Sequence, residues 1–85
     1  MTNNEKYEKV FVDCFLVEKS ALNDGFVYQS VRTWDSVGHM SMIAALESAF
    51  DITMETDDII DFSSYTRGKV LLAKYGVVFE TTEAA

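Results

Sequence analysis

The stretch that decides the fold is Trp34-Asp35-Ser36-Val37-Gly38-His39-Met40, continued by Ser41-Met42-Ile43-Ala44-Ala45-Leu46-Glu47-Ser48-Ala49-Phe50-Asp51-Ile52. Asp35 and Ser36 stand where an irregular segment gives way to helix-forming residues, and short polar side chains there cap the free N–H groups of a helix. We therefore predict a helix from about Ser36 to Phe50. It is the most apolar helix of the chain, and its predicted broad apolar face consists of Val37, Met40, Ile43, Ala44, Leu46 and Phe50.

Two different segments precede this helix. From about Glu5 to Val17 apolar residues recur at i, i+3, i+4, i+7 and i+8, which places them on one face of a helix. They are Tyr7, Val10, Phe11, Cys14 and Phe15. The range 20–33 has no such period and contains the turn signal Asn23-Asp24-Gly25, so we predict a long loop. Apolar residues are expected to pack this loop onto the bundle, namely Leu22, Phe26, Tyr28, Val31 and Trp34.

The range after Ile52 predicts two more helices. Thr56 is expected to cap a single helical turn over 56–62, with acidic residues in its first turn. A last helix is predicted from Tyr65 to Tyr75, ended by Gly76 in a left-handed cap. Beyond it we expect 77–79 to fold back on the bundle and residues 1–4 and 81–85 to be frayed. The fold class is therefore all-α, with three longer helices, a short third helix and a long loop between the first two.

Composition restricts the function classes. The 85 residues suffice for one domain, and 14 acidic against 7 basic residues give a net charge of −7. Such a charge disfavours nucleic acid and anionic membranes and favours partners with basic patches. One cysteine and one histidine exclude an internal disulfide and a Cys/His zinc site, so Cys14 is expected to be a small buried apolar residue.

The composition also bears on location and metal binding. The first residues lack the pattern of a signal peptide and no apolar run is long enough to cross a bilayer, so we expect a cytoplasmic protein without membrane insertion. The range 51–62 lacks the central glycine and terminal glutamate of an EF-hand loop, so no metal is expected.

A spaced series of residues carries a family resemblance. It consists of Asp35-Ser36, Leu46-Glu47, Phe50, Ile52 and Asp57-Asp58-Ile59. From about Trp34 to Gly76 the chain resembles acyl carrier proteins. The resemblance implies a four-helix bundle of acyl-carrier type, with 4′-phosphopantetheine attached covalently to Ser36 and an acyl group carried on it as a thioester. Such a protein is not an enzyme.

The resemblance also implies partners. They are a phosphopantetheinyl transferase, with coenzyme A as donor, and acyl-loading, acyl-transferring or ketosynthase-type enzymes with basic patches; the carrier itself is expected to be a monomer. The expected partner-contacting residues are Asp35, Val37, His39, Met40, Glu47, Asp51, Glu55, Asp57 and Asp58. Val37 stands where leucine is usual, and Ser41 and Ser48 stand where acids are frequent, which suggests a carrier dedicated to one biosynthetic pathway.

The first turn of the Ser36 helix suits this chemistry, because its free N–H groups and dipole stabilise a phosphate. Gly38 costs helix stability, and we interpret it as leaving room for the arm or an approaching enzyme. His39 shares a helix face with Ser36, but no third group orients it as a base, so we expect it exposed to a partner or to solvent. An acyl chain would be lined by Met40, Ile43, Leu46, Ile59 and Ile60.

Two alternatives stay open. The cargo could be an aminoacyl group, as on peptidyl carrier proteins, although the acidic balance favours an acyl group. The chain could also be an unmodified helical adaptor that binds a basic partner through its acidic face. Substitution of Ser36 by alanine separates carrier from adaptor, since only the carrier requires the hydroxyl.

Overall fold

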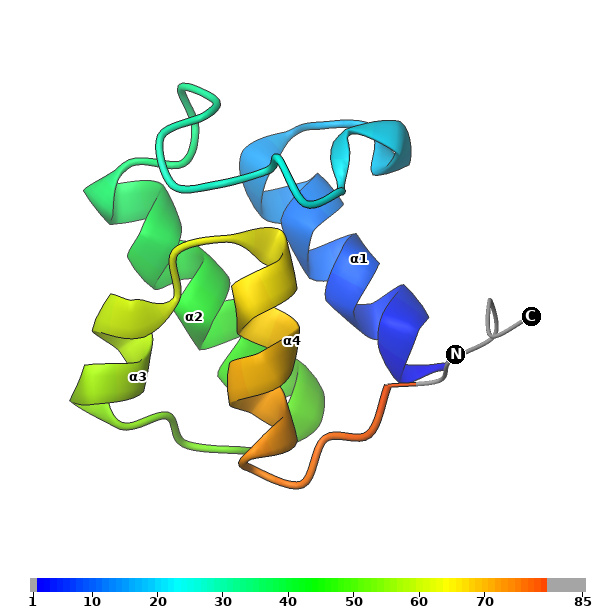
Figure 1. Cartoon of the computed structure of the whole chain (residues 1–85), viewed down its shortest axis with the longest axis vertical. Coiled ribbons are helices and arrows are strands. Elements are labelled where there is room, and N and C mark those ends of the chain that lie inside the picture. Colours follow the sequence, from blue (N-terminus) through cyan, green and yellow to red (C-terminus); the bar gives the residue numbers. More distant parts are fainter. Residues whose placement is uncertain (1, 80–85) are drawn as a thin grey trace.

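The computed structural model describes residues 2–79 and contains four α-helices, with no strand within that range (Figure 1). They are α1 (Asn3–Phe15), α2 (Ser36–Phe50), α3 (Thr56–Asp61) and α4 (Tyr65–Ala73), and a short 3-10 helix, η1 (Lys19–Ala21), follows α1. The predicted all-α class is confirmed. None of the described helices combines the length and the apolar character needed to cross a membrane.

Helix α1 begins two residues earlier than predicted because of a capping box. The Thr2 hydroxyl accepts the Glu5 N–H at 3.1 Å, and the Glu5 carboxylate accepts the Thr2 N–H at 2.9 Å, a bond that lowers the pKa of Glu5. The helix ends at Phe15, two residues before the predicted Val17, and its C-cap Leu16 is left-handed, with φ of 57°. The expectation of a frayed start is thus wrong for residues 2–4, while 81–85 lie outside the described residues.

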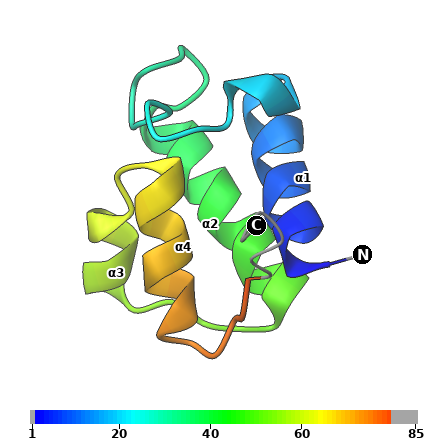
Figure 2. The same ribbon diagram turned by 45° about the vertical axis from the view of Figure 1, so that its right-hand side comes forward.

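The core lies between α1, α2 and α4 and is rich in aromatic rings (Figures 1 and 2). Phe11 of α1 is fully buried at its centre. Its ring centroid lies 5.0 Å from that of Tyr65, 5.6 Å from Trp34 and 5.9 Å from Phe26. Cys14 is half-buried, and burial raises the pKa of its thiol. The apolar face predicted for α1 is confirmed, because Tyr7, Val10, Phe11 and Phe15 are buried in the core.

The bounds predicted for α2 are confirmed, but part of its predicted apolar face is wrong. Val37 and Met40 are 76% and 52% exposed, and Ala44 is exposed as well. The residues that α2 buries are Met42, Ile43 and Leu46. Apolar residues surround this helix on nearly every side, so their period could not settle which side faces the core.

The long segment between α1 and α2 crosses one end of the bundle (Figures 1 and 2). The Tyr28 N–H donates to the Ser63 carbonyl and the Tyr65 N–H to the Phe26 carbonyl, both at 2.9 Å. Phe26 and Trp34 are buried, as predicted. The loop is thereby fixed to the connection between α3 and α4, far along the chain.

The caps of the last two helices follow the prediction only in part. Helix α3 has Glu55 as its N-cap, without a side-chain hydrogen bond, so the assignment of Thr56 as the cap is wrong. Helix α4 is capped by Ser64, whose hydroxyl accepts the Arg67 N–H at 2.9 Å. Helix α4 ends at Ala73 with Lys74 as a right-handed C-cap, so the predicted end at Tyr75 and the cap at Gly76 are wrong. Gly76 is left-handed, as predicted, with φ of 88°, but it lies in the turn after the helix.

The chain after α4 returns to α1, as expected. Val77 is buried, and the Asn3 side-chain amide donates to the Val78 carbonyl at 2.8 Å. The Phe79 ring lies 5.3 Å from the Tyr7 ring. This return covers the side of the core between α1 and α4.

Candidate functional site

Ser36 is the first residue of α2, a helix of 15 residues. The preceding Asp35 is the N-cap, and its carboxylate accepts the Gly38 N–H at 2.8 Å. Ser36 is exposed, and its hydroxyl forms no hydrogen bond with any residue in the described range. Because Asp35 performs the capping, the Ser36 hydroxyl is not needed by the fold.

A pocket of about 300 Å³ adjoins Ser36. Its walls come from the loop, the start of α2, α3 and the segment leading into α4, and its lining residues are Tyr28, Ser36, His39, Met40, Ile59, Ile60, Phe62 and Ser63. Of the residues expected to line an acyl chain, some line this pocket and others lie in the core. Met40, Ile59 and Ile60 line this pocket, whereas Ile43 and Leu46 are buried in the core.

His39 is half-buried and both of its ring nitrogens are engaged. Its Nδ1 accepts the indole N–H of Trp34 at 2.9 Å, and its Nε2 lies 2.8 Å from the Ile59 carbonyl oxygen. An indole nitrogen can only donate, so Nδ1 carries no hydrogen and Nε2–H donates to Ile59. This Trp34–His39–Ile59 bridge joins the end of the loop to α2 and α3. The expectation of an exposed His39 is wrong.

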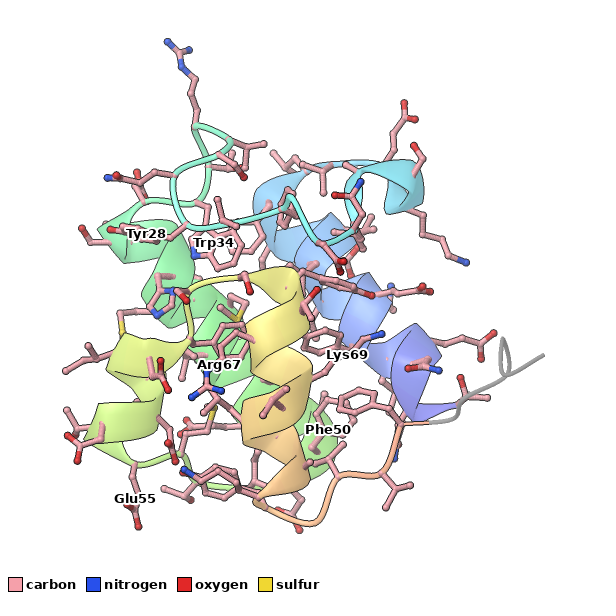
Figure 3. The ribbon with its side chains drawn as sticks, in the orientation of Figure 1. Tyr28, Trp34, Phe50, Glu55, Arg67 and Lys69 are labelled. Atoms are coloured by element: carbon pink, nitrogen blue, oxygen red, sulfur yellow. The ribbon has the colours of Figure 1, made fainter. Side chains whose placement is uncertain are left out.

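Aromatic rings hold the imidazole on its other sides. The Tyr28 and Phe62 rings meet it edge-on, with centroids at 5.7 Å and 6.1 Å, and the Trp34 ring lies nearly parallel to it at 6.2 Å. Trp34 is fully buried behind it. Figure 3 shows Tyr28 and Trp34 where the loop meets the start of α2. The inner wall of the pocket is thus a fixed imidazole in front of the core.

Gly38 faces the protein rather than the approach to Ser36. A Cβ atom at this position would lie 2.0 Å from the Thr33 carbonyl oxygen and 3.3 Å from Cε1 of Phe15. The interpretation that this glycine clears space for an arm or enzyme is therefore wrong. It allows the loop backbone to pack directly on the first turn of α2.

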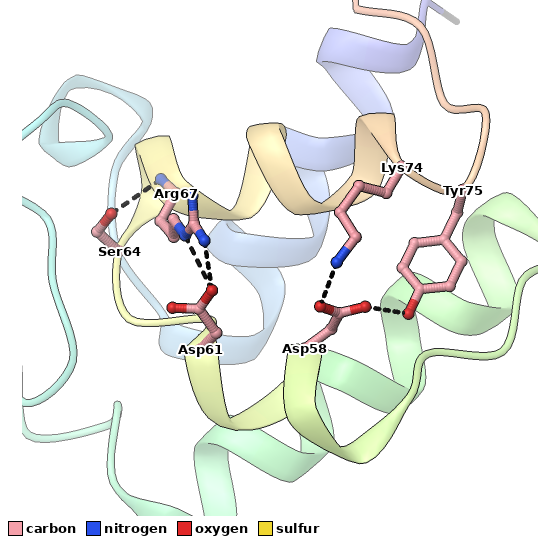
Figure 4. A network of polar contacts seen from close by, with 6 residues as sticks. All are labelled: Asp58, Asp61, Ser64, Arg67, Lys74 and Tyr75. Atoms are coloured by element: carbon pink, nitrogen blue, oxygen red, sulfur yellow. Dashed lines mark hydrogen bonds and ion pairs between the residues drawn. The ribbon is translucent and has the colours of Figure 1, made fainter.

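Asp58, one of the expected partner-contacting residues, is buried and paired within the protein, unlike an acid of an exposed recognition face. It is only 7% exposed, and its carboxylate accepts hydrogen bonds from Lys74, at 2.7 Å, and from the Tyr75 hydroxyl (Figure 4). The Lys74 ammonium, followed by the Tyr75 hydroxyl, holds the pKa of Asp58 below its ordinary value of 3.8. Asp61 pairs with Arg67 beside it, so two acids tie α3 to α4 (Figure 4).

The other expected contact residues differ in exposure. Glu47 is half-buried, and its carboxylate accepts the Met54 N–H at 2.9 Å. This hydrogen bond holds the segment between α2 and α3 against α2. The acids that are exposed are Asp35, Asp51, Glu55 and Asp57. Ile60, which sequence reasoning assigned only to an interior lining, is 75% exposed.

Comparisons of the chain with family models, with curated proteins and with solved structures give no match. Ser36 supplies a hydroxyl at a helix start, next to a pocket with mostly apolar lining. His39 cannot serve as its base in this arrangement, since Trp34 and Ile59 occupy the imidazole. The arrangement suits a hydroxyl that another enzyme modifies.

Proposed function

We propose that the chain is a carrier protein of the acyl-carrier type, whose Ser36 receives a 4′-phosphopantetheine arm from coenzyme A. The observation that supports this most is the exposed, unbonded Ser36 hydroxyl in the first turn of α2, beside an apolar pocket. In the transfer Ser36 Oγ attacks the phosphorus next to the pantetheine group, and the phosphoanhydride bond breaks. A phosphodiester forms, the hydroxyl proton passes to the transferase and adenosine bisphosphate leaves.

The start of α2 can hold the new negative charge. The N–H groups of Ser36 and Val37 find no acceptor among residues 2–79, because the first N–H groups of a helix lack a partner within it. Together with the positive end of the helix dipole they favour a phosphate at this place. The Asp35 carboxylate accepts only the Gly38 N–H, so the N–H groups of Ser36 and Val37 stay available to a phosphate.

The surface around Ser36 suits docking of partner enzymes. Val37, Met40 and Ile60 are exposed apolar side chains on α2 and α3, the two helices that border the pocket. Exposed apolar groups beside a reactive residue are typical of interaction sites. The exposed acids Asp35, Asp51, Glu55 and Asp57 would steer enzymes with basic patches, the transferase first among them.

Intact mass tests the proposal. The native chain is incubated with coenzyme A and a broad-specificity phosphopantetheinyl transferase, alongside Ser36→Ala and Ser63→Ala. Ser63 is a matched control, because it is also an exposed serine that lines the pocket. We expect one arm on the native chain and on Ser63→Ala, and none on Ser36→Ala. Since Asp35 keeps the cap, Ser36→Ala should change the stability by less than about 0.5 kcal/mol.

No addition to the folded native chain by more than one transferase would overturn the carrier proposal. The acidic adaptor would then be the better interpretation. In that case the Ser36→Ala chain should bind its partner as tightly as the native chain does.

A further inference from the structure

The Trp34–His39–Ile59 bridge closes the inner end of the pocket beside Ser36, and we propose that it restricts the cargo to short, apolar acyl groups. This inference rests on the proposed function, because it concerns the group that the Ser36 arm carries. His39 acts here as a specificity-determining residue.

The bridge separates the pocket from the core. The imidazole is held from two sides, by the Trp34 indole at 2.9 Å and by the Ile59 carbonyl at 2.8 Å. Trp34 itself is fully buried. An acyl chain that passed the imidazole toward the buried Trp34 would have to displace this ring and break both hydrogen bonds. Buried polar groups without partners would remain, which opposes entry.

The volume in front of the bridge limits the length of the cargo. A pocket of about 300 Å³ is at the small end of ligand sites. An apolar cavity of about 150 Å³ holds one benzene, so this pocket has room for roughly ten carbon-sized atoms. If the end of the arm takes part of this space, an acyl group of about six carbons fills the rest.

The lining decides the polarity of the cargo. Isoleucine, methionine and aromatic side chains form most of it, and within the described chain no acidic residue lines it. An aminoacyl group would place an ammonium there without a counter-ion, at the cost of its hydration. A saturated or branched acyl group meets no such cost.

The rate at which hydroxylamine cleaves the thioester measures how well each acyl group is sheltered. The arm on the native protein is loaded with acetyl, butanoyl, hexanoyl, octanoyl or dodecanoyl groups. Each methylene that enters the pocket should slow cleavage by roughly fourfold, the equivalent of its burial. We expect this slowing to stop near hexanoyl. Slowing that continues through dodecanoyl would overturn the inference.

Two variants at position 39 test the role of the bridge. His39→Ala removes the wall, so octanoyl and dodecanoyl should be cleaved more slowly than on the native protein. His39→Gln retains a donor for Ile59 and an acceptor for Trp34, and should keep the limit near hexanoyl. The same limit in a folded His39→Ala protein would overturn the inference. If that variant does not fold, the native length series decides.

The mass measurement precedes these assays and separates the two failures. A protein that gains no arm overturns the proposed function, and the inference with it. A protein that gains the arm but shelters long chains overturns the inference alone.

Discussion

Replacement of Gly38 by alanine tests how closely the loop packs on the start of α2. The added Cβ atom would lie 2.0 Å from the Thr33 carbonyl oxygen, well inside the 3.0 Å that Cβ contacts essentially never cross. Rotation of a side chain cannot relieve this contact, because Thr33 meets it with its backbone. The loop is also held there by the Thr33 hydroxyl, which donates to the Phe15 carbonyl at 2.7 Å.

The expected loss of stability is the balance of three effects. Alanine gains about 1 kcal/mol over glycine in a helix. Forcing an atom into a packed contact costs about 1 to 3 kcal/mol. If the loop moves away, the hydrogen bond between Thr33 and Phe15 is lost, at about 1 kcal/mol. We expect Gly38→Ala to lower the free energy of unfolding by about 1 to 3 kcal/mol, or Tm by roughly 5 to 20 °C.

Urea and thermal unfolding followed by circular dichroism measure this change. Gly25→Ala is the matched control, because a Cβ atom there would meet only the side-chain oxygen of Asn23, at 3.3 Å. It should stay within about 0.5 kcal/mol of the native chain. A Gly38→Ala protein as stable as the native chain would refute the packing explanation. If that stable protein also accepted the arm slowly, the glycine would serve the approach to Ser36 instead.

Three further predictions follow from the contacts. Gly68→Ala should lower stability by about 1 to 3 kcal/mol in urea unfolding, because its Cβ atom would lie 2.1 Å from Phe62 and 2.2 Å from the Tyr7 hydroxyl; an unchanged midpoint would contradict this packing. The folded-state pKa of Asp58 lies below its unfolded value, so its contribution is present above about pH 4 and lost as the pH falls through the lowered pKa. Asp58→Asn should flatten that acid dependence in urea titrations, and an unaltered slope would exclude Asp58 as its source. Nitrogen NMR at mildly alkaline pH should show His39 with hydrogen on Nε2, and an Nδ1–H tautomer would contradict the bridge.

The features that the sequence predicts well depend on neighbouring residues. The bounds of α2 follow from a capping side chain at Asp35 and from the apolar run that it opens. The left-handed Gly76 follows from the same kind of local chemistry. The apolar period alone places the start of α1 at Glu5, whereas the capping-box spacing of Thr2 and Glu5 indicates the earlier start.

The features that the sequence does not predict depend on partners far along the chain. Asp58 meets Lys74 and Tyr75, which follow it by 16 and 17 residues. His39 meets the Ile59 carbonyl, 20 residues away. The order of residues along the chain indicates neither contact. An acid in the first turn of a helix is already favoured there by the helix dipole, so its position alone does not indicate a distant partner. The burial of Asp58 and the partial burial of His39 follow only from the packing of α3.

Helix α3 is held in place by the contacts of these two groups. It has only six residues, too few for a helix to be stable by itself. The His39 imidazole holds it to α2 through the Ile59 carbonyl, and Asp58 and Asp61 hold it to α4. Because Ile59 lines the pocket beside Ser36, these polar contacts fix one of its walls. Two of the acids in α3, Asp58 and Asp61, therefore fix the helix that forms one wall of the pocket.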